Sequence, residues 1–218
     1  MGFGLPSQSS GSGKPYLKYD GRAGRLHRVD RAQGADGMWS STEVDITRDA
    51  AFVADFANVR IGFINYPKGA APQKVMVPYG TPLPQRPNEL GPDGRPIYRD
   101  GFEFDVVLHK TVAGNDNGQA REVSSTAKVA IDGFGEAFEA YLAAPEKAAG
   151  KLPVLKLVDT VAVKSGQSTN YRPVFKIMSW VDRPPGLSGV QAAPAPAPVR
   201  APEPVGASAD DFPGDDFG

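Results

Sequence analysis

Proline placement is the feature that most constrains how this chain can fold. The chain has 21 prolines and 25 glycines among 218 residues, a content that is high for a helical protein and suits strands, turns and extended segments. Eight of the prolines fall in a long insertion between Tyr66 and Gly101, and insertions of this length are usually functional or disordered. A second group lies in a Pro/Ala tract after Trp180, which is expected to be extended and mobile.

Runs of β-branched and aromatic residues predict six strands outside the proline-rich regions. The alternation in "GFEFDVVL", for example, puts Phe102, Phe104 and Val106 on one face, as in a strand that is buried on one side. "KVMVPY" favours a short strand inside the insertion, and "AGNDNG" (113–118) is typical of a hairpin turn. The six predicted strands are 38–46, 56–66, 101–112, 121–131, 153–163 and 172–181.

A single helix is predicted at 134–144, where Phe134, Phe138, Tyr141 and Leu142 form one apolar stripe before Pro145. The resulting fold class is mainly β. Five strands with one helix between the third and fourth follow the order of an OB-fold barrel, here with an extra N-terminal strand and a long Pro-rich loop. Other arrangements of a β-rich domain with one helix remain open.

These elements divide the chain into four parts. We expect a disordered N-terminus (1–15), an OB-like domain (16–183), a Pro/Ala-rich disordered linker (184–209) and an acidic tip (210–218). Within the domain, the basic stretch 14–31 contains few apolar residues and is interpreted as a loop or arm.

Composition excludes several kinds of site. The chain has no cysteine and only two histidines, which excludes disulfides, a cysteine nucleophile and cysteine-ligated zinc and argues against a multi-histidine metal site. Neither a phosphate-binding loop, a dinucleotide fingerprint nor a Gly-x-Ser-x-Gly elbow occurs, so we expect no enzyme activity and no cofactor. The start does not resemble a secretory signal, and no apolar run is long enough to span a membrane, so a cytoplasmic location is expected.

Binding is the function that these exclusions leave. Proteins that bind single strands without sequence preference combine a positive groove with aromatic rings on which bases stack. Trp39, Tyr66 and Trp180 are the expected stacking rings, with a structural role as a cap on the barrel as the alternative for Trp180. The full set of predicted DNA-binding residues is Trp39, Arg60, Tyr66, Lys68, Lys74, Tyr79, Arg86, Tyr98, Arg99, Lys128, Lys156, Lys176 and Trp180.

Acidic residues on the same strands argue against a uniformly positive binding face. Glu103 and Asp105 share a strand face, and Glu122 lies on the next predicted strand. Paired carboxylates either bind a metal or simply form a solvated face. A metal-dependent enzyme that uses Glu103, Asp105 and His109 therefore stays open as one alternative function.

The charge is distributed unevenly along the chain. From Gly186 on there are one basic and five acidic residues, whereas the preceding part has 23 basic and 20 acidic residues. A mildly basic body is thus joined by a linker to an acidic tip, "ADDFPGDDFG". The tip residues expected to bind partner proteins are Asp210, Asp211, Phe212, Pro213, Asp215, Asp216 and Phe217.

This layout resembles the single-stranded DNA-binding proteins of bacteria and their phages. Asp210-Asp211-Phe212-Pro213 is similar to the Asp-Asp-Ile-Pro of the acidic tip of the bacterial family, with Phe in place of Ile. The family ends on Phe, whereas this sequence continues to Gly218, so docking would rest on internal Phe212 or Phe217. The resemblance implies a barrel that coats single-stranded DNA and a tip that recruits replication or recombination proteins.

A phage structural or assembly module without nucleic-acid binding is the second alternative function, and the near-neutral charge of the body favours it. In the preferred hypothesis the free acidic tip also competes with DNA for the basic groove. The oligomeric state cannot be deduced from the sequence.

Overall fold

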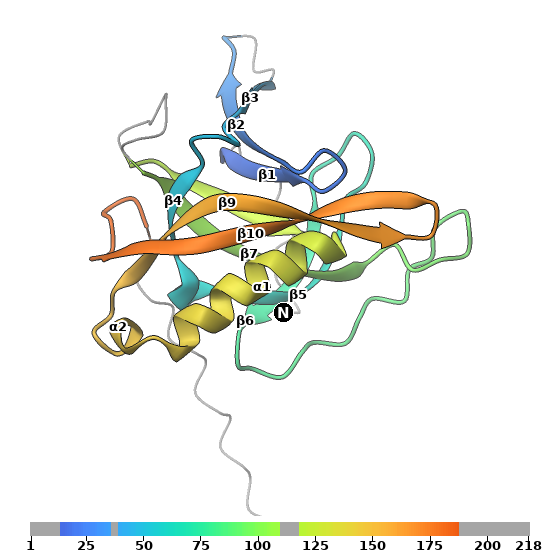
Figure 1. The fold of residues 1–218 in the computed structure, drawn as a ribbon. Helices are drawn as coiled ribbons and strands as arrows, with labels where there is room; N and C mark the ends of the chain where they lie inside the picture. Colours follow the sequence, from blue (N-terminus) through green and yellow to red (C-terminus); the bar gives the residue numbers. More distant parts are fainter. Residues whose placement is uncertain (1–13, 36–38, 110–117, 188–218) are drawn as a thin grey trace, which may run out of the picture.

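The computed structural model describes residues 14–35, 39–109 and 118–187, and its fold is mainly β (Figure 1). No helix in these ranges is long and apolar enough to cross a membrane. The elements are β1 (Tyr16–Asp20), β2 (Arg25–Gln33), β3 (Trp39–Asp45), β4 (Ala51–Ala54), the 3-10 helix η1 (Phe56–Asn58), β5 (Arg60–Asn65), β6 (Gln73–Pro78), β7 (Arg99–Leu108), β8 (Ala120–Ser125), α1 (Lys128–Ala143), α2 (Pro145–Ala148), β9 (Leu152–Ser165) and β10 (Ser168–Val181).

The strands form one mixed sheet in the order β10-β9-β4-β7-β8-β1-β2-β3. Long β7 has two successive neighbours along one edge, because β4 pairs with its C-terminal end and β5 pairs with Arg99–Glu103. Strand β6 continues from β5 as a hairpin, and β1 with β8 is the parallel pair. The sheet is not closed and two helices are present, so the predicted five-stranded barrel with one helix is not confirmed.

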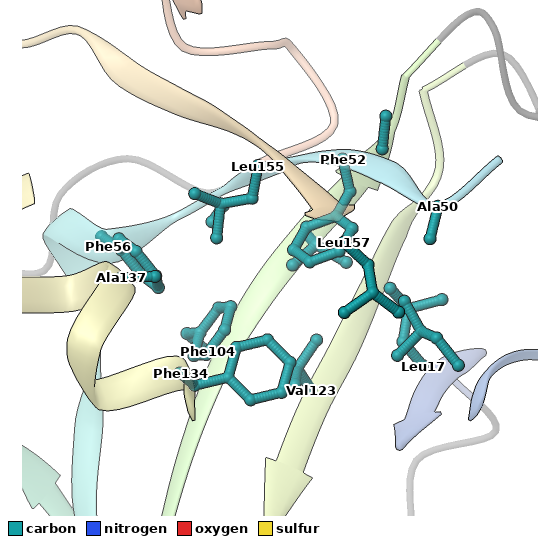
Figure 2. Close-up of a cluster of buried hydrophobic side chains, with 14 of the residues drawn as sticks. Leu17, Ala50, Phe52, Phe56, Phe104, Val123, Phe134, Ala137, Leu155 and Leu157 are labelled. Atoms are coloured by element: carbon teal, nitrogen blue, oxygen red, sulfur yellow. The ribbon is translucent and has the colours of Figure 1, made fainter. Parts of the chain in front are cut away.

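Helix α1 closes the core against the concave side of the sheet. Its buried face includes Ala130, Phe134, Ala137 and Tyr141, which recur at the three- and four-residue spacing of one helical stripe. Gly133 lets the helix approach β10, because a Cβ atom there would lie 2.4 Å from the carbonyl oxygen of Pro173. Figure 2 shows Phe134 beside Phe104 of β7, under the buried side chains of β4 and β9.

Aromatic rings fill the space between α1 and the sheet. The ring of Phe134 lies 5.4 Å from Phe102, 5.6 Å from Phe104 and 4.5 Å from Phe175, measured between centroids. These spacings are typical of favourable edge-to-face and tilted aromatic pairs. The helix therefore ties β7 to β10, two strands that are not neighbours in the sheet.

Three sequence predictions need correction. The basic stretch 14–31 is not an arm, because it folds as β1, a tight turn and β2, with Leu17 and Leu26 buried. The predicted strand 121–131 ends at Ser125, and α1 begins at Lys128, six residues before the predicted helix start. Strand β4 and helix α2 were not predicted at all. The antiparallel pairing of β7 with β8 agrees with the hairpin predicted around 113–118, but most of that turn lies outside the described residues.

The folded body extends beyond the predicted start of the linker. Arg183 donates two hydrogen bonds to the buried carboxylate of Asp55, at 2.6 and 2.8 Å. Leu187 is only 5% exposed and packs with Val53 and Leu152. Residues 182–187 are thus bound to the body, and the rest of the predicted linker, from residue 188, lies outside the described residues.

The aromatic cluster generates a stability prediction. We expect Phe134→Ala to lower the free energy of unfolding by about 3–5 kcal/mol, because it removes a buried ring and leaves a cavity between α1 and the sheet. Glu139→Ala, an exposed position on the same helix, is the matched control and should change stability by less than about 0.5 kcal/mol. Urea unfolding followed by tryptophan fluorescence measures the free energy of unfolding of both variants. Equal effects of the two substitutions would contradict the placement of Phe134 in the core.

Candidate nucleic-acid interface

The outward face of β5 to β8 carries a network of ion pairs. Lys74 of β6 pairs with both Glu103 of β7, at 2.9 Å, and Glu122 of β8. Arg60 of β5 pairs with the other oxygen of Glu103 at 2.8 Å and donates to the carbonyl oxygen of Met76. Two of the predicted DNA-binding cations, Arg60 and Lys74, are therefore bound to carboxylates of the same face.

This network is partly buried, and its charges support one another. Burial alone would raise the pKa of Glu122, but Lys74, the hydrogen bond from Ser124 and Lys14 together lower the pKa below its ordinary value of 4.5. Burial would likewise lower the pKa of Lys74, whereas Glu103 and Glu122 raise it above 10.5. Lys14 adds a further pair with Asp105 at 2.6 Å. The centre of this face is thus electrically balanced rather than positive.

A groove of about 520 Å³ lies at one end of the network, next to Tyr66. The hydroxyl of Tyr66 donates to Ser124 Oγ at 3.2 Å, and Ser124 donates to Glu122 at 2.8 Å, so the network also holds the tyrosine. The side chain of Tyr66 is still 48% exposed. The groove is lined by Ile64, Asn65, Tyr66, Gly91, Pro92, Asp93, Arg95, Pro96, Ile97, Arg99 and Thr126.

The cations around this groove are less neutralised than those of the network. Arg99 is exposed and makes no ion pair with a described residue. Lys68, two residues after Tyr66, is also exposed and makes no ion pair with a described residue, although it does not line the groove. Arg95 is 83% exposed and reaches Asp93 only at 3.9 Å. Arg86, by contrast, pairs with Asp100 at 2.6 Å and lies over the ring of Phe63. An aromatic face and accessible guanidinium groups therefore meet in one groove.

Two tyrosines of the proline-rich insertion differ from one another. Tyr98 is only 6% exposed and its hydroxyl bonds to Gln73, so the prediction that its ring is available to DNA is wrong. Tyr79 is exposed and packs edge-on against Phe138 of α1. It lines a second groove of about 390 Å³ together with Tyr141 and Lys147.

The remaining predicted residues are scattered. Lys128 was expected on a strand but begins α1, where it pairs with Asp132 at 2.8 Å. Lys156 of β9 and Lys176 of β10 lie directly opposite one another and are exposed. None of these three lysines lines the Tyr66 groove.

The two tryptophans also lie outside this groove. Trp180 packs against the core, with its ring 6.2 Å from Tyr141, which supports the structural alternative over stacking. Trp39 is 56% exposed at the start of β3. From the predicted set, the structure thus brings Tyr66 and Arg99 together in one groove and Arg60 and Tyr79 together in the second, and leaves most of the other members apart.

Arg95, Ser124 and Thr126 are the site residues absent from the predicted set. The period-two pattern that places Val123 inward places Glu122 and Ser124 outward, so the signal for Ser124 was present. Nothing in the sequence indicates that Thr126 and loop 91–97 would reach Tyr66, because this contact joins segments far apart in the chain.

Carboxylates of the alternative metal site are engaged by cations. Glu103 pairs with Arg60 and Lys74, and Asp105 pairs with Lys14. No group of three potential metal ligands occurs within residues 14–35, 39–109 and 118–187. The predicted partner-binding tip, 210–218, lies outside the described residues.

Comparisons of the chain with protein-family models, with curated proteins and with solved structures find no match.

The network generates a pH prediction. Folding lowers the pKa of Glu122, so its stabilising contribution is present above the ordinary value of 4.5 and is lost as the pH falls through the lower folded value. We expect Glu122→Gln to lower the melting temperature at pH 7 and to flatten its decline between pH 5 and about pH 3. Scanning calorimetry across this range tests the expectation, and parallel curves for the two proteins would contradict it.

Proposed function

We propose that the protein binds single-stranded DNA without sequence preference, and that the Tyr66 groove is the centre of its binding surface. The observation that carries the proposal is the half-exposed ring of Tyr66 beside Arg95 and Arg99 in one groove. A tyrosine face stacks on any base, and guanidinium groups contact phosphates, so this combination suits binding that ignores sequence.

The strand connections support a partly open OB-like barrel as the scaffold. Five strands that close into a barrel need five ladders, and four are present: β10 with β9, β9 with β4, β4 with β7 and β7 with β8. In place of the fifth, β8 pairs with β1, and the amide of Tyr171 in β10 donates to the carbonyl oxygen of Gly21 just after β1 at 2.6 Å. Helix α1 lies between β8 and β9, as the OB order requires.

The location of the groove also fits this scaffold. OB-folds bind oligonucleotides across their second and third strands and the loops beside them. With β4 and β5 together as the first strand, these are β7 and β8, and the long insertion 66–98 is the first of the binding loops. That loop supplies Tyr66 and Arg95, while Arg99 opens β7 and Thr126 follows β8.

Charge balance determines where phosphates would bind. Lys74 is mostly buried between Glu103 and Glu122 and is unsuited to a phosphate contact. The exposed cations Lys68, Arg95 and Arg99 are suited to it, and each phosphate contact releases counterions. We therefore propose that the strand follows the loop side of the sheet rather than its neutral centre.

The acidic tip completes the proposal. Its two phenylalanines and four aspartates suit a partner surface with an apolar pocket ringed by lysine or arginine. We propose that it recruits replication or recombination proteins and that, when unbound, it competes with DNA for the cationic groove.

Binding is tested by titrating labelled oligo-dT and a duplex of equal length at low and moderate salt. We expect a preference for the single strand and affinity that falls steeply with salt. Tyr66→Ala should weaken binding by about 5- to 150-fold, since stacking contributes roughly 1–3 kcal/mol per base. Arg99→Ala should weaken binding and reduce its salt dependence.

Arg48→Ala is the matched control, because it removes an exposed cation outside the groove and should have little effect. Absence of binding to either nucleic acid at low salt would overturn the proposed function and favour a structural module. Binding that Tyr66→Ala and Arg99→Ala leave intact would overturn the choice of groove.

The role of the tip is tested by a truncation after Leu187, which keeps the bound segment 182–187. We expect this protein to bind oligo-dT more tightly than the full chain at low salt, because the competing acidic segment is gone. Circular dichroism checks that the body is still folded, and equal affinities of the two proteins would contradict the competition.

A further inference from the structure

Among the described strands, β3, β6 and β10 have an edge that no other strand covers. An open edge presents unpaired backbone amides and carbonyls, and soluble proteins usually protect it with proline, lysine, bulges or covering segments. Comparing the three edges therefore shows which of them is available to a partner.

Two of the edges carry such protection. Strand β10 contains Pro173 and two irregularities of register, and its Tyr171 amide is already bonded to Gly21. Strand β6 carries Lys74 and ends at Pro78. Both strands are poor templates for a further strand.

Strand β3 lacks proline, lysine, bulges and a covering strand, and its two acids, Glu43 and Asp45, pair with Lys18 at 3.1 Å and Arg25 at 3.0 Å. Its seven residues, WSSTEVD, include no proline, glycine or lysine, and its pairing with β2 runs without a bulge. All but Val44 are exposed, and the β2–β3 hairpin projects from the rest of the sheet (Figure 1). Trp39, an unusual side chain for an exposed position, lies at its start with 56% of its surface exposed.

The hydrogen-bond pattern shows which residues face the open edge. The amide of Ile46 donates to the carbonyl oxygen of Leu26 at 2.9 Å, while the amide of Leu26 donates to Thr47 Oγ1 at 3.0 Å. Leu26 and Ile46 thus occupy the position of a hydrogen-bonded pair, with one of its two backbone bonds formed. Such pairs alternate along an antiparallel ladder, which directs the backbone groups of Val44, Thr42 and Ser40 toward β2. The backbone groups of Trp39, Ser41, Glu43 and Asp45 then point outward.

We propose that β3 pairs antiparallel with β3 of a second copy of this chain, about a two-fold axis at Thr42. This inference goes beyond the proposed DNA binding and does not depend on it. Full overlap of the two strands sets Ser41 opposite the partner's Glu43 and Trp39 opposite the partner's Asp45. Both are pairs of outward-facing residues, as a continuous ladder requires.

Charge is the reason for choosing a second copy in this orientation. The acids of β3 lie in its C-terminal half, and antiparallel overlap places each of them opposite an uncharged residue of the other copy. A parallel pair in register would place Glu43 against Glu43 and Asp45 against Asp45, and like charges directly opposite are destabilising. The antiparallel arrangement thus avoids the contacts between like charges that a parallel one would make.

A disulfide trap tests the two-fold axis. Thr42 would face its own copy as a pair without hydrogen bonds, whose Cα atoms lie about 4.5 Å apart, within the range of a disulfide. The chain has no cysteine, so Thr42→Cys introduces the only thiol. With oxidised glutathione the full-length variant should form a disulfide-linked dimer, whereas Ser40→Cys, which would lie opposite the partner's Val44, should not. Equal crosslinking of the two variants would overturn the proposed two-fold axis at Thr42.

Sedimentation of the full chain over a range of concentrations tests the pairing without crosslinks. We expect a monomer–dimer equilibrium that Ser41→Glu weakens at least tenfold, because it places a carboxylate opposite the partner's Glu43. Ser41→Lys, at the same exposed position, should strengthen it, and salt should diminish both effects. A monomeric wild-type chain at all concentrations, or equal effects of the two substitutions, would overturn the proposal.

Discussion

The contact of α1 with the sheet is the constraint on which the rest of the structure depends. Phe134 touches rings from both β7 and β10, and Gly133 brings the helix backbone against Pro173. Strands β7 and β10 are not neighbours in the sheet. By contacting both, the helix fixes the curvature of the sheet, which brings these two strands to the same side of the core. The outward face of β7 and β8, with the ion-pair network and the Tyr66 groove, is the other side of the same curved layer.

Local patterns predicted the elements whose apolar residues repeat with a clear period. Strands β5, β7 and β10 and the centre of α1 were found this way, whereas β9 was found as a largely apolar run whose first four residues are all buried. The start of α1 was missed because Val129 and Ile131 also fit a strand alternation, and the tertiary contacts of the helix decide between the two. Strand β4 was missed because four buried residues are too few to show a period.

The β1–β2 hairpin was missed for a different reason. Its sequence is basic and poor in apolar residues, yet its charges are paired within the fold. Asp30 of β2 accepts from Arg28 and from Arg121 of β8, which is almost completely buried. From the sequence, Arg121 is expected at the surface, because its carboxylate partner Asp30 lies some ninety residues away along the chain.

The same limit explains why the predicted binding residues separated into two groups. Residue type and face placed Arg60 and Tyr66 on one outward face and Lys74 in the insertion, but did not identify the carboxylate neighbours of Arg60 and Lys74. Pairing with Glu103 and Glu122 turns Lys74 from a candidate phosphate ligand into a structural residue that helps to hold Tyr66 through Ser124. The acids that seemed to argue against nucleic-acid binding thus neutralise the centre of the sheet and leave the uncompensated cations on the loop beside the exposed ring. Short-range charge pairing, rather than the near-zero net charge of the chain, therefore determines where a polyanion would bind.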